Sequence, residues 1–122
     1  MPDEIIGRFY FKQTSNGNLI GEFSNHQSDQ IFTESADLKS AKGNLYIGKY
    51  NSTWQENGKS PCFANLEILP RNGSGKIFSL TWSENNGTPI FRGEGMLCDS
   101  IMIGDYQSVP KQMSPQPVSK II

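Results

Sequence analysis

The stretch Gly-Lys-Tyr-Asn-Ser-Thr-Trp-Gln-Glu-Asn-Gly-Lys-Ser-Pro-Cys-Phe, residues 48–63, is repeated in outline by Gly-Lys-Ile-Phe-Ser-Leu-Thr-Trp-Ser-Glu-Asn-Asn-Gly-Thr-Pro-Ile-Phe, residues 75–91. Both stretches contain Gly-Lys, an aromatic residue, Thr-Trp, a polar segment with Glu, Asn and Gly, and then Pro with an apolar pair. A strand, an Asn/Gly turn and a returning strand make a β-hairpin. Repeated hairpins can remove their exposed edges by closing on themselves, so the repeat predicts an antiparallel barrel.

Around these hairpins, side chains alternate between apolar or small and polar, which is the period of a half-buried strand. In 76–83, for example, Phe78, Leu80 and Trp82 alternate with polar residues. The inward sets mix bulky aromatic residues with Gly, Ala and Ser, and that mixture fits the curvature of a small barrel. We therefore predict an all-β, single-domain, antiparallel up-and-down barrel of about eight strands, with short helix or none.

Residues 24–44 break the alternation. They are polar apart from Ile31 and Phe32. The segment indicates a short, irregular strand, a helical turn over 36–41, and a connection that covers one mouth of the barrel.

The C-terminal end also loses the alternation. From Ser108 onward the chain carries Pro110, Pro115 and Pro117. We predict a barrel domain over 1–107 and a disordered Pro-rich tail over 108–122, with a docking peptide as the alternative for the tail.

Composition and charge exclude several classes of protein. The chain has 122 residues, a net charge of −1 and no Lys/Arg run, so a nucleic-acid binder is not expected. No apolar stretch approaches a membrane span, and no basic segment precedes an apolar one at the N-terminus, so we predict a cytoplasmic protein, with secretion left open. In a reducing compartment, Cys62 and Cys98 are expected to be free thiols rather than a disulfide.

Catalytic and metal chemistry is not indicated. His26 is the only histidine, and the two cysteines are not at metal-ligand spacing. The acidic residues fall mostly at outward strand positions or in turns, where no pair is placed to act as acid and base. We predict no metal, no cofactor and no enzymatic activity.

An ordered set of short motifs resembles the avidin-like branch of the lipocalin-like (calycin) β-barrels over about residues 7–107. The resemblance implies an eight-stranded up-and-down barrel, an oligomer, and room for one small molecule beside a stacking Trp at the position of Trp82. The motifs, in chain order, are Gly7-Arg8-Phe9-Tyr10, Asn16-Gly17-Asn18-Leu19-Ile20-Gly21-Glu22-Phe23, Ile47-Gly48-Lys49-Tyr50, Phe78-Ser79-Leu80-Thr81-Trp82 and Phe91-Arg92-Gly93-Glu94-Gly95.

The resemblance does not carry biotin binding with it. The family holds the ureido oxygen of biotin with an Asn, a Ser and a Tyr, and the matching positions here are Phe11, Ser15 and Phe23. The family's late Trp has no counterpart around 102–106. A site that loses such hydrogen bonds loses orders of magnitude in affinity, so we expect weak or no biotin binding.

Two functions remain open. The first is a non-enzymatic binder of an apolar or aromatic small molecule, in which Trp82 is the main wall and Gly93 and Gly95 leave space beside it. In the second, the rings fill the core and the protein acts as an interaction or inhibitor module through its loops. A mouth of a few hundred Å3 with several polar atoms would favour the ligand, and a filled interior would favour the interaction. The candidate ligand-binding residues are Trp82, Phe91, Trp54, Tyr50 and Tyr106.

Overall fold

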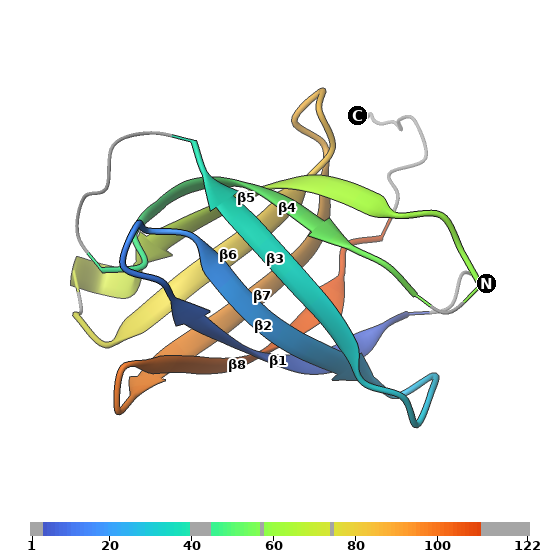
Figure 1. Ribbon diagram of the computed structural model, residues 1–122, viewed down its shortest axis with the longest axis horizontal. Coiled ribbons are helices and arrows are strands. Elements are labelled where there is room, and N and C mark those ends of the chain that lie inside the picture. The colour runs from blue at the N-terminus through green and yellow to red at the C-terminus, as the bar shows by residue number, and fades with distance from the viewer. Residues whose placement is uncertain (1–3, 40–44, 57, 74, 111–122) are drawn as a thin grey trace, which may run out of the picture.

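The computed structural model describes residues 4–39, 45–56, 58–73 and 75–110, which form one closed antiparallel β-barrel (Figure 1). The strands follow one another around the barrel in chain order. A single turn of 3-10 helix, η1 (Arg71–Gly73), is the only helix in the described part of the chain. The prediction of an eight-stranded up-and-down barrel is therefore confirmed. The strands are β1 (Ile6–Gln13), β2 (Leu19–Asn25), β3 (Phe32–Leu38), β4 (Gly48–Trp54), β5 (Cys62–Pro70), β6 (Ile77–Ser83), β7 (Pro89–Cys98) and β8 (Ile101–Ser108).

The barrel closes because the first strand pairs with the last. β1 pairs with β8 from Ile6↔Gln107 to Lys12↔Ile101, in addition to its hairpin partner β2. Next to this seam, the amide of Ile5 donates a hydrogen bond of 2.8 Å to Oγ of Ser108. Every strand therefore has two neighbours, and the sheet has no free edge.

Alternation along the strands produces a core rich in aromatic side chains. In β6, Phe78, Leu80 and Trp82 are buried, as the sequence pattern predicts. Inward positions elsewhere hold further rings, among them Phe11 and Tyr50, each of which is fully buried. Because the rings project from all sides into a narrow barrel, they fill most of its interior.

Residues 32–38 form a regular strand, so the predicted helical turn over 36–41 is wrong for its described part. β3 pairs with β2 and with β4, and its burial pattern alternates strictly over Phe32, Glu34 and Ala36. An acidic side chain at an inward position disguised the alternation in the sequence. The rest of the predicted turn, 40–44, lies outside the described residues.

The last strand is longer than predicted at its C-terminal end. Ser108 belongs to β8, and the amide of Val109 donates to the carbonyl of Ile90 at 2.9 Å. Ser108 and Val109 therefore belong with the barrel and not with the predicted tail, of which 111–122 lie outside the described residues.

One end of the barrel is closed by Tyr46, which is fully buried. Its Oη lies 2.9 Å from the carbonyl oxygen of Phe11 and 2.8 Å from that of Ser100. Its carbonyl accepts a hydrogen bond of 2.8 Å from Oη of Tyr50, and its amide donates to Oε1 of Gln13 at 2.8 Å. Tyr46 with its partners Gln13 and Tyr50 thus forms a plug whose polar atoms are satisfied.

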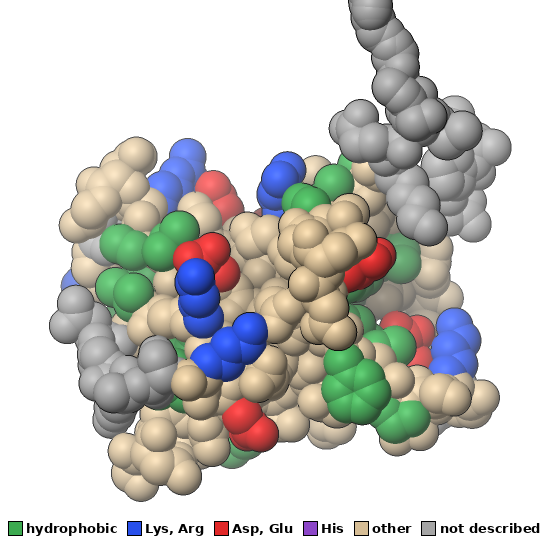
Figure 2. All heavy atoms as spheres, turned by 90° about the horizontal axis from the view of Figure 1, so that it is seen from above, with side chains coloured by type: hydrophobic (Ala, Val, Ile, Leu, Met, Phe, Trp, Pro, Cys, Tyr) green, Lys and Arg blue, Asp and Glu red, His purple; other side chains and the backbone are tan. Residues whose placement is uncertain are grey.

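The outer surface mixes charged and apolar side chains. On the face seen in Figure 2, hydrophobic side chains form separate small groups with acidic and basic side chains between them. Cys62 is half-buried and Cys98 is exposed, and both are free cysteines. Among the described residues, no helix is both long and apolar enough to cross a membrane.

Candidate functional site

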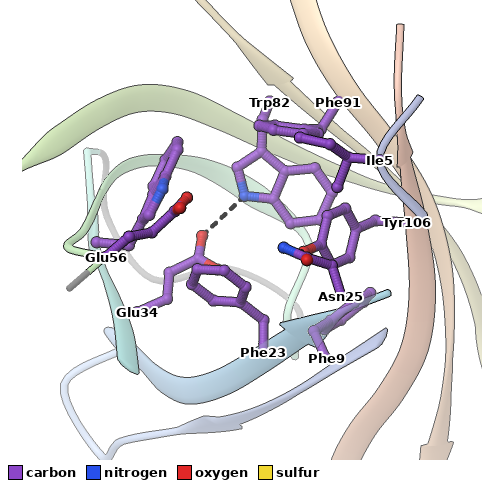
Figure 3. Close-up of a pocket in the computed structure, with 10 residues that line it drawn as sticks. Ile5, Phe9, Phe23, Asn25, Glu34, Glu56, Trp82, Phe91 and Tyr106 are labelled. Carbon is purple, nitrogen blue, oxygen red and sulfur yellow. Dashed lines mark hydrogen bonds between the residues drawn. The ribbon is translucent and has the colours of Figure 1, made fainter. Parts of the chain in front are cut away.

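A small cavity lies at the end of the barrel opposite Tyr46, and we call its lining the mouth site (Figure 3). The lining side chains come from the mouth-side ends of β2, β3, β4, β6, β7 and β8, from β1, and from the segments next to β1 and β4. Aromatic rings form most of the wall, and three polar side chains interrupt it. The mouth site consists of Ile5, Phe9, Phe23, Asn25, Glu34, Trp54, Glu56, Trp82, Phe91 and Tyr106.

The aromatic rings hold one another in place. Trp82 contacts Phe9 nearly edge to face at a centroid distance of 5.8 Å, and Tyr106 at 6.1 Å. Phe91 contacts Tyr106 edge to face at 5.5 Å and Trp54 at 6.3 Å. Such tilted and edge-to-face pairs are favourable geometries, so the wall is preorganised.

The register between β6 and β7 shifts at this wall. Trp82 pairs with Phe91, whereas Ser83 pairs with Pro89, so Ile90 is an extra residue in β7. A bulge of this kind bends the strand locally, and bulges occur preferentially at barrel rims and beside functional sites. The carbonyl of Ile90 accepts the hydrogen bond from Val109, which ties the bulge to the end of β8.

Glu34 is the central polar group of the mouth site. It is inward on β3 and only 7% exposed. Ser52 on β4 donates a hydrogen bond of 2.6 Å, and the indole Nε1 of Trp82 on β6 donates one of 2.8 Å. Burial raises the pKa of Glu34 above its ordinary value, while the hydrogen bonds from Ser52 and Trp82 act in the opposite direction. Burial prevails, so the neutral acid is favoured relative to an exposed Glu.

The two oxygens of Glu34 are not equivalent. Both Ser52 and Trp82 donate to Oε2. Among the residues that the structure describes, no hydrogen bond reaches the second oxygen, Oε1. Since a buried oxygen without a partner is unfavourable, Oε1 is available to a group that enters the cavity.

Further polar atoms surround the same space. In Figure 3 the carboxyl group of Glu34 and the amide of Asn25 both lie below the indole of Trp82. Nδ2 of Asn25 is 3.5 Å from Oη of Tyr106, and Oδ1 of Asn25 accepts a hydrogen bond from the amide of Gln27 at 3.0 Å. Burial raises the pKa of the Tyr106 hydroxyl, so this group stays neutral.

The rim of the mouth site carries a second carboxylate. The side chain of Glu56 is 32% exposed, and one of its oxygens lies 3.8 Å from Nζ of Lys59. Ile5 and Phe91 are also partly exposed. The cavity therefore opens outward between an acidic and two apolar side chains.

The cavity volume is about 30 Å3, enough for about two water molecules. Pockets for drug-sized ligands reach several hundred Å3. The space expected beside Gly93 and Gly95 is taken by neighbours, because a Cβ added at Gly95 would meet Cγ of Met102 at 2.7 Å and one added at Gly93 would meet Cβ of Tyr106 at 3.1 Å. The barrel interior is filled, which by the criterion above favours the interaction function, and at the mouth only the head of a ligand fits.

Four of the five predicted site residues come together at the mouth. They are Trp54, Trp82, Phe91 and Tyr106. Tyr50 shares their inward face but lies at the closed end, where it bonds to the carbonyl of Tyr46. The polar residues Asn25 and Glu34 were not predicted; the alternation Phe-x-Glu-x-Ala in β3 was the signal that could have found Glu34.

Comparisons of this chain with models of protein families, with curated proteins and with solved structures find no match. The resemblance to avidin-like barrels therefore remains a prediction. No group of three or more His, Cys, Asp or Glu side chains in the described ranges is placed to hold a metal ion. The chemistry available at the mouth is that of one buried carboxyl group, a second carboxyl group at the rim, an amide, and six aromatic side chains of which one is a phenol.

Proposed function

We propose that this chain is a non-enzymatic binding protein whose mouth site takes the polar head of a small, mostly apolar or aromatic molecule. The observation that carries the proposal is Glu34, a nearly buried acid whose Oε1 receives no hydrogen bond from the described residues. Glu34 accepts from Ser52 and Trp82 at Oε2 alone, so these two hydrogen bonds do not offset the penalty of burying its second oxygen. A ligand group that pairs with Oε1 would offset that penalty.

The size of the cavity limits the ligand. A volume of about 30 Å3 takes a head group of one or two heavy atoms. The remainder of the molecule would extend outward against Phe91 and Ile5, which are partly exposed at the rim. A compound with a narrow polar end and a short apolar or aromatic body is therefore favoured over a bulky ring system.

Intrinsic fluorescence tests the proposal directly, because the chain's two tryptophans, Trp54 and Trp82, both line the mouth. A screen of small amines, alcohols, acids and aromatic compounds should give members that change the emission and raise the melting temperature by mass action. Phe91→Ala should weaken binding of these compounds by about tenfold, the effect of losing an aromatic contact. Phe63→Ala is the matched control, since Phe63 is 72% exposed and does not line the mouth. A screen without any response, or an equal loss in both variants, would refute the proposal.

A second candidate function is pairing with another protein, in the first instance a second copy of the chain. A row of outward-facing apolar side chains crosses β6, β7 and β8, where Ile77 pairs with Met96 and Met96 pairs with Ile103. Their exposed fractions are 42%, 57% and 46%. Tyr10 continues this row on β1. Contiguous exposed apolar side chains are typical of interaction surfaces, and the filled interior agrees with this function.

Light scattering over a concentration series tests the second candidate. We expect a mass above that of the monomer for the native chain. Ile103→Glu should restore the monomer mass, whereas Phe63→Glu, at a β5 side chain that is 72% exposed and outside this row, should not. A monomer at all concentrations would exclude self-association through the row.

A further inference from the structure

We propose that the mouth site selects a small organic cation, a primary ammonium group on a short apolar tail, and that Glu34 is its counter-ion. This inference rests on the proposed function of the mouth and names the class of its ligand. It is carried by the geometry of Glu34, by the aromatic rings around it and by the charge of the lining.

When Glu34 is ionised, both of its oxygens accept only, and Oε1 then favours a donor as its partner. Oε2 already accepts from Ser52 at 2.6 Å and from Trp82 at 2.8 Å, and these two donors hold the carboxyl group in one orientation. An ammonium group brings three N–H donors and no acceptor. One of them can bond to Oε1, and Oη of Tyr106 is a second acceptor in the lining.

The aromatic lining favours a cation over a neutral donor. The rings of Trp54, Trp82 and Phe91 border the cavity. A cation is attracted to the face of an aromatic ring, and the attraction is larger where water is excluded. No Lys or Arg side chain is among the described residues that line the cavity, whereas both Glu34 and Glu56 are. The lining therefore attracts positive and repels negative head groups.

The volume of the cavity limits the size of the cationic head group. About 30 Å3 admits an ammonium head and the first carbon of its tail. A trimethylammonium or guanidinium group needs more space than two water molecules occupy. We therefore expect primary amines to bind better than quaternary ammonium compounds.

Binding of a cation is coupled to the ionisation of Glu34. Because burial raises the pKa of Glu34, the free protein holds this acid neutral over a wider pH range than an exposed Glu. The ammonium group stabilises the carboxylate, so binding releases a proton to the buffer wherever the free acid is protonated. Affinity should consequently rise with pH and level off above the pKa of free Glu34.

Other charged groups act on this equilibrium. Tyr106 on β8 faces the same space, and its pKa is raised chiefly by burial, with Glu34 and Glu56 also raising it and Arg8 lowering it. Glu56 is paired with the exposed Lys59 at the rim. Ser52, Trp54 and Trp82, on the strands β4 and β6, carry no charge. Glu34 is therefore the buried acid that responds to a cation, and Glu56 adds a screened, solvent-exposed contribution.

The test compares three probes with the same tail: butylammonium, 1-butanol and butyrate, at constant ionic strength, with tryptophan fluorescence and titration calorimetry. We expect butylammonium to bind at least about tenfold more tightly than 1-butanol, as a hydrogen bond to a charged group implies, and butyrate not to bind. Calorimetry in two buffers of different ionisation enthalpy should show proton release on binding of butylammonium. Tetramethylammonium should bind more weakly than butylammonium.

Glu34→Gln isolates the charge. The amide oxygen of Gln can accept from both Ser52 and Trp82, so the fold and its two hydrogen bonds are retained. The variant should lose about tenfold in affinity for butylammonium, keep its affinity for 1-butanol, and lose the proton release. Glu67→Gln removes the same charge on β5, outside the mouth, and should change nothing.

The outcomes separate the two proposals. If 1-butanol binds as tightly as butylammonium, or if Glu34→Gln leaves butylammonium binding and proton release unchanged, the cation inference is wrong while the mouth site stands. If none of the probes and none of the screened compounds changes the fluorescence or the melting temperature, the proposed function fails as well.

Discussion

The indole Nε1 of Trp82 donates a hydrogen bond of 2.8 Å to Oε2 of Glu34. This bond crosses the inside of the barrel, because β6 and β3 are separated in the sheet by β4 and β5. It joins the main aromatic wall of the mouth to its one buried acid. Any change in the charge of Glu34 therefore acts directly on the side chain that reports on the mouth by fluorescence.

Trp82→Ala should be strongly destabilising. The ring is 4% exposed and packs against Phe9 and Tyr106, so its removal leaves a cavity and takes away one of the two hydrogen bonds that Glu34 accepts. We expect a loss of about 3–5 kcal/mol in the free energy of unfolding, measured by urea denaturation. Trp82→Phe keeps a ring and removes the N–H, and should lose about 1–3 kcal/mol. A loss below about 1 kcal/mol for Trp82→Ala would mean that the ring is loosely packed.

Glu34 should make the fold less stable as pH rises. Its pKa is above the ordinary 4.5 in the folded state, so the folded protein binds this proton more tightly than the unfolded chain. Its contribution to stability is complete below pH 4.5 and is lost as pH rises through the folded pKa. Denaturation of the native chain and of Glu34→Gln across this range should show the variant gaining in relative stability as pH increases. Parallel pH profiles would contradict a raised pKa.

Alkaline pH should act on the closed end. Burial raises the pKa of Tyr50 to about 12, the hydrogen bond from Gln13 acts against this, and the charge of Tyr46 adds to it. The unfolded value is 10.0, so the stability that Tyr50 contributes is present below pH 10.0 and is lost as pH rises toward about 12. The pKa values of Tyr46 and Tyr106 are also raised by burial, so a spectrophotometric titration of tyrosinate should show several groups that ionise late, and Tyr50→Phe should remove one of them. If all the tyrosines ionised near their ordinary pKa, the burial of Tyr50 at the closed end would be contradicted.

Gly104→Ala should disrupt the seam between β7 and β8. A Cβ at Gly104 would collide with the carbonyl oxygen of Glu94, and it would lie 2.8 Å from Cα of Gly95. Since these are backbone atoms, the strands must separate, and we expect a loss of about 1–3 kcal/mol in thermal or urea denaturation. Gly75→Ala is the control, because nothing lies within 4 Å of the added methyl group. Equal effects of the two substitutions would show that the strands tolerate the contact.

Biotin should not bind measurably. Phe11 and Phe23 stand where the resembled family has polar ligands, and they are 0% and 8% exposed, so they occupy the interior that the bicyclic ring would need. A cavity of about 30 Å3 is too small for that ring. Titration calorimetry should give no heat of binding. Submicromolar affinity would refute the residue-by-residue comparison.

Strand alternation made the fold predictable, but it could not give the site in full. The parity of a position tells which face a side chain takes, and this placed Tyr50 and Trp54 together inside β4. It does not tell how far along the barrel each lies, and four residues of a strand span about 13 Å. Tyr50 therefore belongs to the plug and Trp54 to the mouth.

The sequence pattern also failed to place the polar residues that point into the barrel. Hydrophobic patterning treats an acid as outward, so Glu34 made β3 look irregular, although Phe32 and Ala36 on either side keep the inward period. Its partners Ser52 and Trp82 lie on strands that only the folded barrel brings opposite β3. Such a contact depends on barrel closure and strand register, which no local pattern contains.

The pairing of β1 with β8 also determines when the mouth can exist during synthesis. Phe9 emerges from the ribosome almost a hundred residues before its strand partner Gly104. Contacts of such long sequence separation form late, because the loop between them must first be ordered. Tyr106 and Phe91 arrive with the last two strands, so a nascent chain that ends before β8 has the plug residue Tyr46 but no mouth. Binding of a ligand would thus report completion of the barrel, and a C-terminal truncation within β8 would abolish binding and closure together.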